Sequence, residues 1–108
     1  MSTLEIQQAL AELTQLNKRG VEALFEAEEE LAHAENELDS VEARAFLDAE
    51  GSVAERQARA KLVAADARLR RDLAKASVNR IKTKLRSVES ELMAQATLAK
   101  ILQAEMKL

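Results

Sequence analysis

Apolar residues recur along residues 3–50 at alternating spacings of three and four positions, which is the period of a coiled-coil helix. One track holds Leu10, Leu24, Leu31, Leu38 and Ala45, with Asn17 in its remaining slot, and the adjacent track holds Ile6, Leu13, Gly20, Ala27, Ala34 and Val41. Large residues on one track and mostly small ones on the other suit the close antiparallel approach of a second helix. The pattern predicts one long helix over about residues 3–50 with a single packing face.

The second half of the chain carries a related pattern with one change of phase. From residue 78 on, one track holds Val78, Leu85, Leu92, Ala99 and Met106, and the other holds Ile81, Val88, Gln95 and Leu102. Upstream, Leu62, Leu69, Leu73 and Ala76 keep helical spacing in a shifted phase. This shift predicts a second helix over about residues 53–106 with a stutter near residues 76–81, where the supercoil unwinds locally.

Helix-start signals place the connection between these two helices. Ser2-Thr-Leu-Glu5 and Ser52-Val-Ala-Glu55 both match the capping box, in which the serine oxygen accepts from the backbone N–H three residues on. Gly51 precedes the second box and suits the left-handed residue that closes a helix. A turn at residues 51–52 is so short that the two helices are expected to be antiparallel neighbours. Gly20 raises the alternative of a break in the first helix, because Asn17-Lys-Arg-Gly20 resembles a helix C-terminus.

Composition supports the same fold class. The chain has 108 residues, 2 glycines and no proline, so little in it would punctuate strands or turns. Alanine is abundant and only Phe25 and Phe46 are aromatic, which excludes a thick globular core. We expect an all-α fold, a long antiparallel two-helix coiled-coil hairpin forming a single domain over residues 1–108.

Two helices alone bury one narrow stripe, so further contacts are expected. Phe25 and Phe46 lie three heptads apart on one side of the first helix, and Leu47 lies beside the latter. Leu102 and Met106 lie where the second helix overhangs its partner. These five residues are the expected contacts of self-association, most simply a dimer that forms a four-helix bundle.

The net charge of −3 conceals two opposed halves. Residues 1–50 hold 13 acids and 3 bases, a charge of −10, whereas residues 51–108 hold 6 acids and 13 bases, a charge of +7. A fold about Gly51 pairs residue i with about residue 102 − i. Leu10 then faces Leu92, Leu13 faces Val88, and Leu31 lies between Leu69 and Leu73. In this register the acidic block (Glu22, Glu26, Glu28, Glu29, Glu30, Glu35, Glu37) faces Arg68, Arg70, Arg71, Lys75 and Arg80. We expect these charges to select the pairing of the helices more than to stabilise it.

Candidate catalytic and metal sites are few. The chain has no cysteine and one histidine, which excludes thiolate catalysis and cysteine-based metal sites. Glu30-Leu-Ala-His33 has the spacing used in di-metal helical bundles, but His33 falls on the outward face of the predicted helix. The Glu28–Glu30 run lies on an exposed face, without the burial that separates the pKa values of catalytic carboxylates. We expect no enzyme activity, no metal site and no cofactor.

A basic stripe on the second helix is the main alternative site. Arg71, Lys75, Lys82 and Arg86 share one helical face and could track phosphates of a nucleic acid. Base stacking is excluded there because no aromatic residue follows Phe46. Pairing of these bases with the acidic helix is the favoured interpretation. A third interpretation, weaker still, is that the acidic helix mimics the charge of DNA.

We expect a cytoplasmic protein, because the sequence shows neither a membrane-spanning stretch nor a secretory signal. The longest unbroken apolar run, residues 62–65, is far too short to span a membrane. The start of the chain has neither a basic flank nor an apolar stretch of the secretory kind.

The stretch Phe46-Leu-Asp-Ala-Glu-Gly-Ser-Val-Ala-Glu-Arg56, followed by Gln57-Ala-Arg-Ala-Lys61, resembles small all-helical proteins of tailed bacteriophages and prophages. In those proteins a charged helix leads into a Gly-Ser or Gly-Thr turn and a second long helix. Leu85-Arg-Ser-Val-Glu-Ser-Glu-Leu92 is also of their type, so the resemblance covers roughly residues 40–100. It implies a phage accessory role, often near replication or recombination genes, and assigns no functional residues.

Together these observations predict a non-enzymatic coiled-coil protein that acts by protein–protein contact. The expected setting is phage DNA metabolism or interference with a host factor, in the host cytoplasm. The alternative is non-specific nucleic-acid binding through the second helix.

Overall fold

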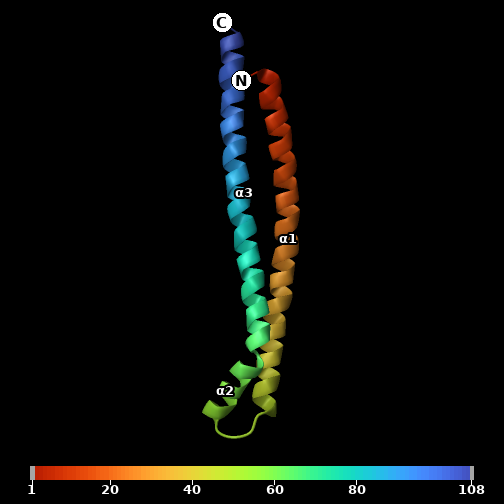
Figure 1. The fold of residues 1–108 in the computed structure, drawn as a ribbon, viewed down its shortest axis with the longest axis vertical. Coiled ribbons are helices and arrows are strands. Elements are labelled where there is room, and N and C mark those ends of the chain that lie inside the picture. Colours follow the sequence, from red (N-terminus) through yellow and green to blue (C-terminus); the bar gives the residue numbers. More distant parts are fainter. Residues whose placement is uncertain (1, 108) are drawn as a thin grey trace. The chain divides into compact units, whose positions relative to one another are not determined.

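The computed structural model describes residues 2–107, and all regular secondary structure in this part of the chain is helical. Helix α1 (Thr3–Asp48) is followed by α2 (Val53–Val63) and α3 (Ala65–Met106) (Figure 1). The expected all-α fold class is confirmed. Contacts divide the chain into two compact units. We call the residues up to 24 together with those from 80 on the terminal unit, and residues 25–79 the turn unit.

Each unit contains helices that run antiparallel. In the terminal unit, the first half of α1 lies beside the second half of α3 (Figure 1). Gly20 of α1 lies against Leu85 of α3. In the turn unit, Glu37 of α1 pairs with Arg70 of α3, and Glu42 of α1 pairs with Arg68 of α3. Residue numbers increase along α1 while those of the paired residues in α3 decrease, so the two helices run antiparallel.

The predicted helix starts are confirmed. The hydroxyl oxygens of Ser2 and Ser52 accept from the backbone N–H groups of Glu5 and Glu55, each at 3.2 Å. Gly51 adopts a φ of 110°, a backbone conformation that is strained for any residue with a side chain. These groups satisfy free N–H donors at the start of each helix and reverse the chain between α1 and α2.

Helix α1 continues through Gly20, so the alternative of a break at that residue is wrong. The glycine serves packing instead. A Cβ atom there would lie 2.5 Å from Leu85 Cδ2, closer than real atoms approach. The missing side chain therefore makes room for Leu85, which is buried against α1.

The range predicted as one second helix, residues 53–106, holds two helices. They meet at Ala64, which is fully buried. The Arg68 guanidinium donates to the carbonyl oxygen of Lys61 at 3.4 Å and also lies 3.7 Å from a Glu42 carboxylate oxygen. Arg68 thus links α1 to a carbonyl oxygen in the last turn of α2, where carbonyl oxygens lack an N–H donor within the helix. The capping rules gave no sign of this junction because it contains neither glycine nor proline.

The two tracks predicted for the first helix form the packing face of α1. Ile6, Leu13, Ala27 and Leu38 are buried on it. The remaining members are half-buried, namely Leu10, Asn17, Gly20, Leu24, Leu31, Ala34, Val41 and Ala45. The predicted packing face of the first helix is therefore confirmed.

The packing face of α2 and α3 differs from the prediction before residue 78. Downstream the predicted tracks are buried or half-buried, except for Met106, which is exposed. Upstream, Leu62, Leu69, Leu73 and Ala76 are exposed, so the stutter near residues 76–81 is wrong. The heptad continues in one phase through Ala60, Ala64, Ala67, Arg71 and Ala74. Alanines fill this face because Leu38 packs directly against Ala64 and Ala67, leaving no space for a larger residue.

The register between the helices also differs from the prediction, in which the numbers of two facing residues add up to about 102. The numbers of Gly20 and Leu85 add up to 105, and those of Glu37 and Arg70 add up to 107. Leu69 and Leu73, the expected neighbours of Leu31, are exposed. In the turn unit α2 diverges from α1 (Figure 1), so α3 comes beside α1 several residues later than a simple hairpin would require.

Two amides lie on the packing face of the terminal unit. Asn17 Oδ1 and Gln95 Oε1 are buried and accept no hydrogen bond from the described residues. Polar groups at such positions lower stability but restrict the registers in which two helices can pair.

Candidate functional site

The clearest candidates for function are side chains that the packing face leaves exposed. On α1 in the turn unit, Phe25 is 64% exposed and Leu47 is 74% exposed. Both were predicted to contact another chain, and neither is needed for packing within the turn unit. Large exposed apolar side chains on a helix are typical of protein-binding surfaces when they gather on one face.

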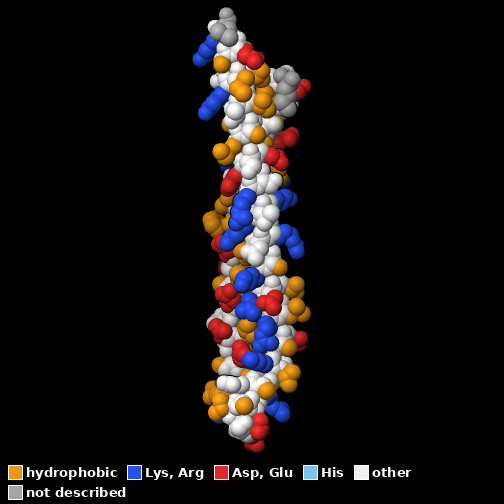
Figure 2. Space-filling view, turned by 90° about the vertical axis from the view of Figure 1, so that its left-hand side faces the viewer, with side chains coloured by type: hydrophobic (Ala, Val, Ile, Leu, Met, Phe, Trp, Pro, Cys, Tyr) orange, Lys and Arg blue, Asp and Glu red, His pale blue; other side chains and the backbone are white. Residues whose placement is uncertain are grey.

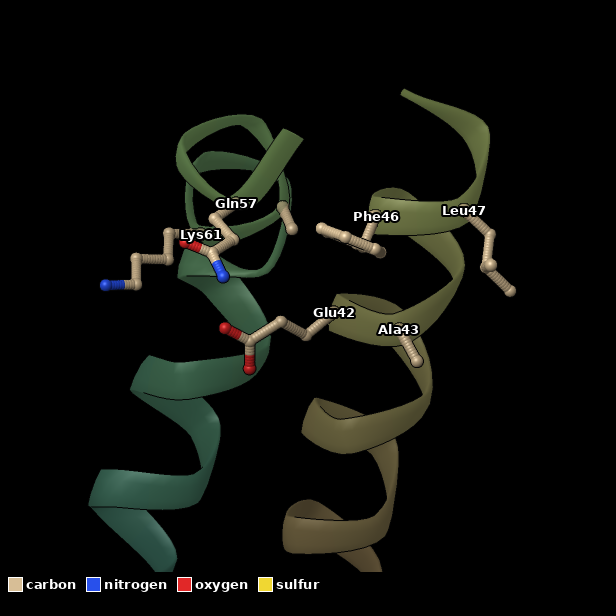
Figure 3. A pocket seen from close by; sticks show the side chains of 7 residues that line it. Glu42, Ala43, Phe46, Leu47, Gln57 and Lys61 are labelled. Carbon is tan, nitrogen blue, oxygen red and sulfur yellow. The ribbon is translucent and has the colours of Figure 1, made fainter. Parts of the chain in front are cut away.

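Phe46, the third predicted contact on α1, is engaged inside the turn unit. Its ring points from α1 toward α2, whereas Leu47 points away (Figure 3). The Arg56 guanidinium lies over the ring, 4.3 Å from its centroid. The Arg56 Nε–H also donates to the Phe46 carbonyl oxygen at 3.1 Å. This cation–π contact fixes α2 against α1, a role that the sequence pattern did not indicate.

An open hollow of about 550 Å³ lies beside Phe46. Its lining comes from α1 and α2 and consists of Glu42, Ala43, Phe46, Leu47, Gln57, Ala60 and Lys61 (Figure 3). The Glu42 carboxylate is already paired with Arg68. Most of the exposed surface of the hollow is apolar, and Gln57 and Lys61 add polar groups to its lining, a chemistry that suits an amphipathic segment of another protein.

Among residues 2–107, acidic and basic side chains of the two halves form fewer ion pairs than the sequence predicts. Of the predicted acidic block, Glu37 pairs across the helices with Arg70, at 2.7 Å. Arg68 pairs instead with Glu42, which lies outside that block. Both pairs are partly exposed, so each contributes at most about 1 kcal/mol. Figure 2 shows Lys and Arg side chains interleaved with acidic and apolar ones on the face that it presents.

The four residues of the predicted basic stripe have different surroundings. Arg71, in the turn unit, takes a half-buried position on the packing face and pairs with its neighbour Asp72 at 2.7 Å. Lys75, in the same unit, and Lys82 and Arg86, in the terminal unit, are exposed. Within the described residues, these three make no ion pair.

The predicted contacts at the other end of α3 lie in the terminal unit. Leu102 is half-buried, and Met106 is 75% exposed. Both line a hollow of about 220 Å³ together with Ile6 and Leu10 of α1. The end of α3 therefore packs partly on the start of α1 rather than overhanging it completely.

His33 and the acidic run beside it are exposed on α1. His33 Nε2 lies 3.9 Å from a Glu29 carboxylate oxygen, and both side chains are largely in solvent. Among residues 2–107, no three His, Cys, Asp or Glu side chains gather closely enough to hold a metal ion. Over the same residues, no helix has the length and apolar character that crossing a membrane requires.

The exposed leucines before residue 78 are the candidates that sequence reasoning assigned wrongly. Leu62, Leu69 and Leu73 are 78, 58 and 62% exposed. The signal that places them was present, because counting back in heptads from Val78 and Ile81 reaches Ala74, Arg71, Ala67 and Ala64. The prediction assigned the leucines to the packing face because they are large. In the structure, the heptad phase determines which residues lie on the packing face.

Comparison with known proteins adds no relative to this picture. No protein-family model matches the chain, and no similar protein is found among curated sequences or solved structures.

Proposed function

We propose that this chain is a non-enzymatic helical interaction protein that acts by protein–protein contact and self-associates. In this proposal the helices form an antiparallel coiled-coil hairpin, and two copies form a four-helix bundle. The phage setting, in DNA metabolism or against a host factor in the host cytoplasm, is proposed from the sequence resemblance alone.

The exposure of Phe25 and Leu47 on α1 carries the proposal. A helix pair buries one face of each helix, and these two residues lie off that face. Covering such a side chain in a contact is worth up to about 1.5–3 kcal/mol, so both residues would contribute to the free energy that holds a second copy. The neighbouring hollow beside Phe46 supports the same proposal, because most of its exposed surface is apolar.

Sedimentation velocity tests self-association. We expect the wild-type chain to sediment as a dimer at micromolar concentration, and the double variant Phe25→Glu, Leu47→Glu to sediment as a monomer. A glutamate carboxylate buried in the dimer contact would lose its hydration without gaining a partner, which costs free energy. The two substitutions should therefore prevent the contact. Met93→Glu is the matched control, because Met93 is 72% exposed on α3 and was not predicted as a contact. A monomeric wild type, or a dimer that persists in the double variant, would contradict the proposed self-association.

Nucleic-acid binding is the second candidate function. Lys75, Lys82 and Arg86 make no ion pair within the described residues, which supports this candidate over pairing with the acidic helix. With no aromatic side chain after Phe46, the contact would be electrostatic and independent of base sequence.

Fluorescence anisotropy with labelled single- and double-stranded oligonucleotides tests this second candidate. If the bases contact phosphates, affinity should fall linearly in log–log form up to about 200 mM salt, with a slope of roughly 0.9 per phosphate on duplex DNA. Gln at Lys75, Lys82 and Arg86, the three exposed bases of the stripe, should abolish binding and leave stability nearly unchanged. Gln at Lys18, Arg19 and Lys100 removes the same charge elsewhere and is the control. Absence of binding at low salt would reject this candidate.

A further inference from the structure

One side of the terminal unit carries a hollow of about 350 Å³ between α1 and α3. Leu16 and Arg19 of α1 line it together with Lys84 of α3, and most of its exposed surface is apolar. With Asn17 and Leu85 at position a of the heptad, Leu16 and Lys84 take position g, and Arg19 takes the adjacent position c. We call positions c and g of both helices in the terminal unit the Leu16 face.

The uncharged residues of the Leu16 face suit contact with another helix pair. Leu16, Leu98 and Ile101 are 42, 40 and 50% exposed, so the packing of α1 on α3 covers them only in part. Three alanines lie on the same face and allow a close approach (Ala9, Ala23, Ala94). Apolar side chains that gather on one face are typical of a protein contact.

The charged residues of the Leu16 face are sorted along its length. Its acids all lie on the side of the chain ends (Glu5, Glu12, Glu91, Glu105). Its bases all lie on the other side of Leu16 (Arg19, Arg80, Lys84). All seven side chains are exposed, and within the described residues none of them forms an ion pair. The face thus has an acidic half and a basic half, both unpaired.

Each helix repeats the same spacing of opposite charges on this face. Glu12 and Arg19 are seven residues apart in α1, and Lys84 and Glu91 are seven residues apart in α3. In an antiparallel copy each acid meets the base of the same helix in the other chain. The midpoints of the two spacings fall at residues 15–16 and 87–88, and Leu16 and Val88 line the same hollow. One two-fold axis therefore satisfies both helices.

We propose that the Leu16 face binds the same face of a second copy, in antiparallel orientation, about a two-fold axis beside Leu16. Glu12 then faces Arg19 of the second copy, and Glu91 faces its Lys84. Leu16 of each copy lies against Leu16 of the other at the hollow. This inference rests on the proposed self-association and adds a second contact to the one at Phe25 and Leu47. Neither contact is expected to hold the dimer alone at micromolar concentration.

The order of charges determines the orientation of the second copy. A parallel copy in register would place Glu12 beside Glu12 and Lys84 beside Lys84, and like charges at a contact cost free energy. The antiparallel copy removes every such juxtaposition at these four residues. Charges of this kind select partner and orientation, while the apolar residues between them supply the burial.

Charge reversal tests the contact by sedimentation velocity. Arg19→Glu with Lys84→Glu makes the whole face acidic apart from Arg80, and Glu12→Lys with Glu91→Lys makes its centre basic. We expect each variant to dissociate at least tenfold more readily than the wild type, because like charges then meet across the axis. Since all four residues are exposed, circular dichroism should show unchanged helix content.

Two further samples separate a specific contact from a general effect of charge. The two variants mixed in equal amounts should form a heterodimer, and the chain with all four changes should dimerise like the wild type. Lys18→Glu with Arg86→Glu is the matched control. These exposed bases take position b, on the other side of the same helices, so their reversal should leave the dimer unchanged.

Cysteine cross-linking tests the two-fold axis, and the chain has no cysteine of its own. Two cysteines form a disulfide only when their Cα atoms lie within about 7 Å. Ser87→Cys lies beside the axis and should link the two copies under mild oxidation. Ile101→Cys lies on the same face but far from the axis, so it should stay unlinked. Linking of both positions would indicate parallel copies and overturn the antiparallel arrangement.

The outcomes distinguish this inference from the proposed function. A dimer that survives both charge reversals but not Phe25→Glu with Leu47→Glu would overturn this inference and leave the proposed contact intact. A dimer with the opposite response would support the Leu16 face and overturn the contact at Phe25 and Leu47. A monomeric wild type would overturn both.

Discussion

Replacing Leu38 by alanine is expected to lower the free energy of unfolding by about 2–3 kcal/mol. Leu38 is 6% exposed and packs on Ala64 and Ala67, with Val41 beside them. Because the neighbours are small, they cannot close over the space that the leucine leaves. The change should be measured by urea denaturation followed by circular dichroism, at one protein concentration, since self-association would make stability depend on concentration.

Leu69→Ala is the matched control for this prediction. It removes the same atoms from a side chain that is 58% exposed in the same unit, and we expect a change within about 0.5 kcal/mol. Equal losses in the two variants would mean that Leu69 is buried in solution. That result would restore the shifted phase that the sequence pattern predicts for residues 62–76.

The second large effect is expected from enlarging a small residue. Ala67→Leu should lower the free energy of unfolding by about 1–3 kcal/mol, because Ala67 is 2% exposed and lies directly against Leu38. The added atoms must push α3 away from α1 or force Leu38 out of its rotamer. Thermal unfolding followed by circular dichroism measures the loss.

Ala76→Leu controls for the added leucine itself. Ala76 is exposed on the outer side of the same helix, so an enlarged side chain meets no neighbour there and stability should stay within about 0.5 kcal/mol. A stable Ala67→Leu variant would show that α1 and α3 can separate without loss, and would contradict the close approach at Ala64 and Ala67.

Much of the architecture follows from local rules. Ser2 and Ser52 accept the hydrogen bonds that the capping pattern predicts, and Gly51 takes the positive φ that only glycine adopts easily. The packing face of α1 lies where heptad spacing places it, from Ile6 to Ala45. Each of these features depends on residues a few positions apart, so sequence spacing contains the necessary information.

The candidate surfaces were only partly predictable. Phe25 and Leu47 lie exposed, as their positions off the packing face suggest, but Phe46 is held under Arg56. That contact joins residues on two different helices, and no spacing rule within one helix anticipates it. The pairing of Arg68 with Glu42 is of the same kind, because it depends on the register between α1 and α3.

The sequence by itself determined that the chain is helical, where α1 starts, where the chain turns, and which face of α1 is packed. Tertiary structure decided the junction at Ala64, the register of α3 beside α1, and the choice of alanines over leucines for the inner face before residue 78. The physical reason is distance: at Ala64 and Ala67 the helices approach so closely around Leu38 that only small residues fit. The leucines are therefore left on the outside, exposed to solvent.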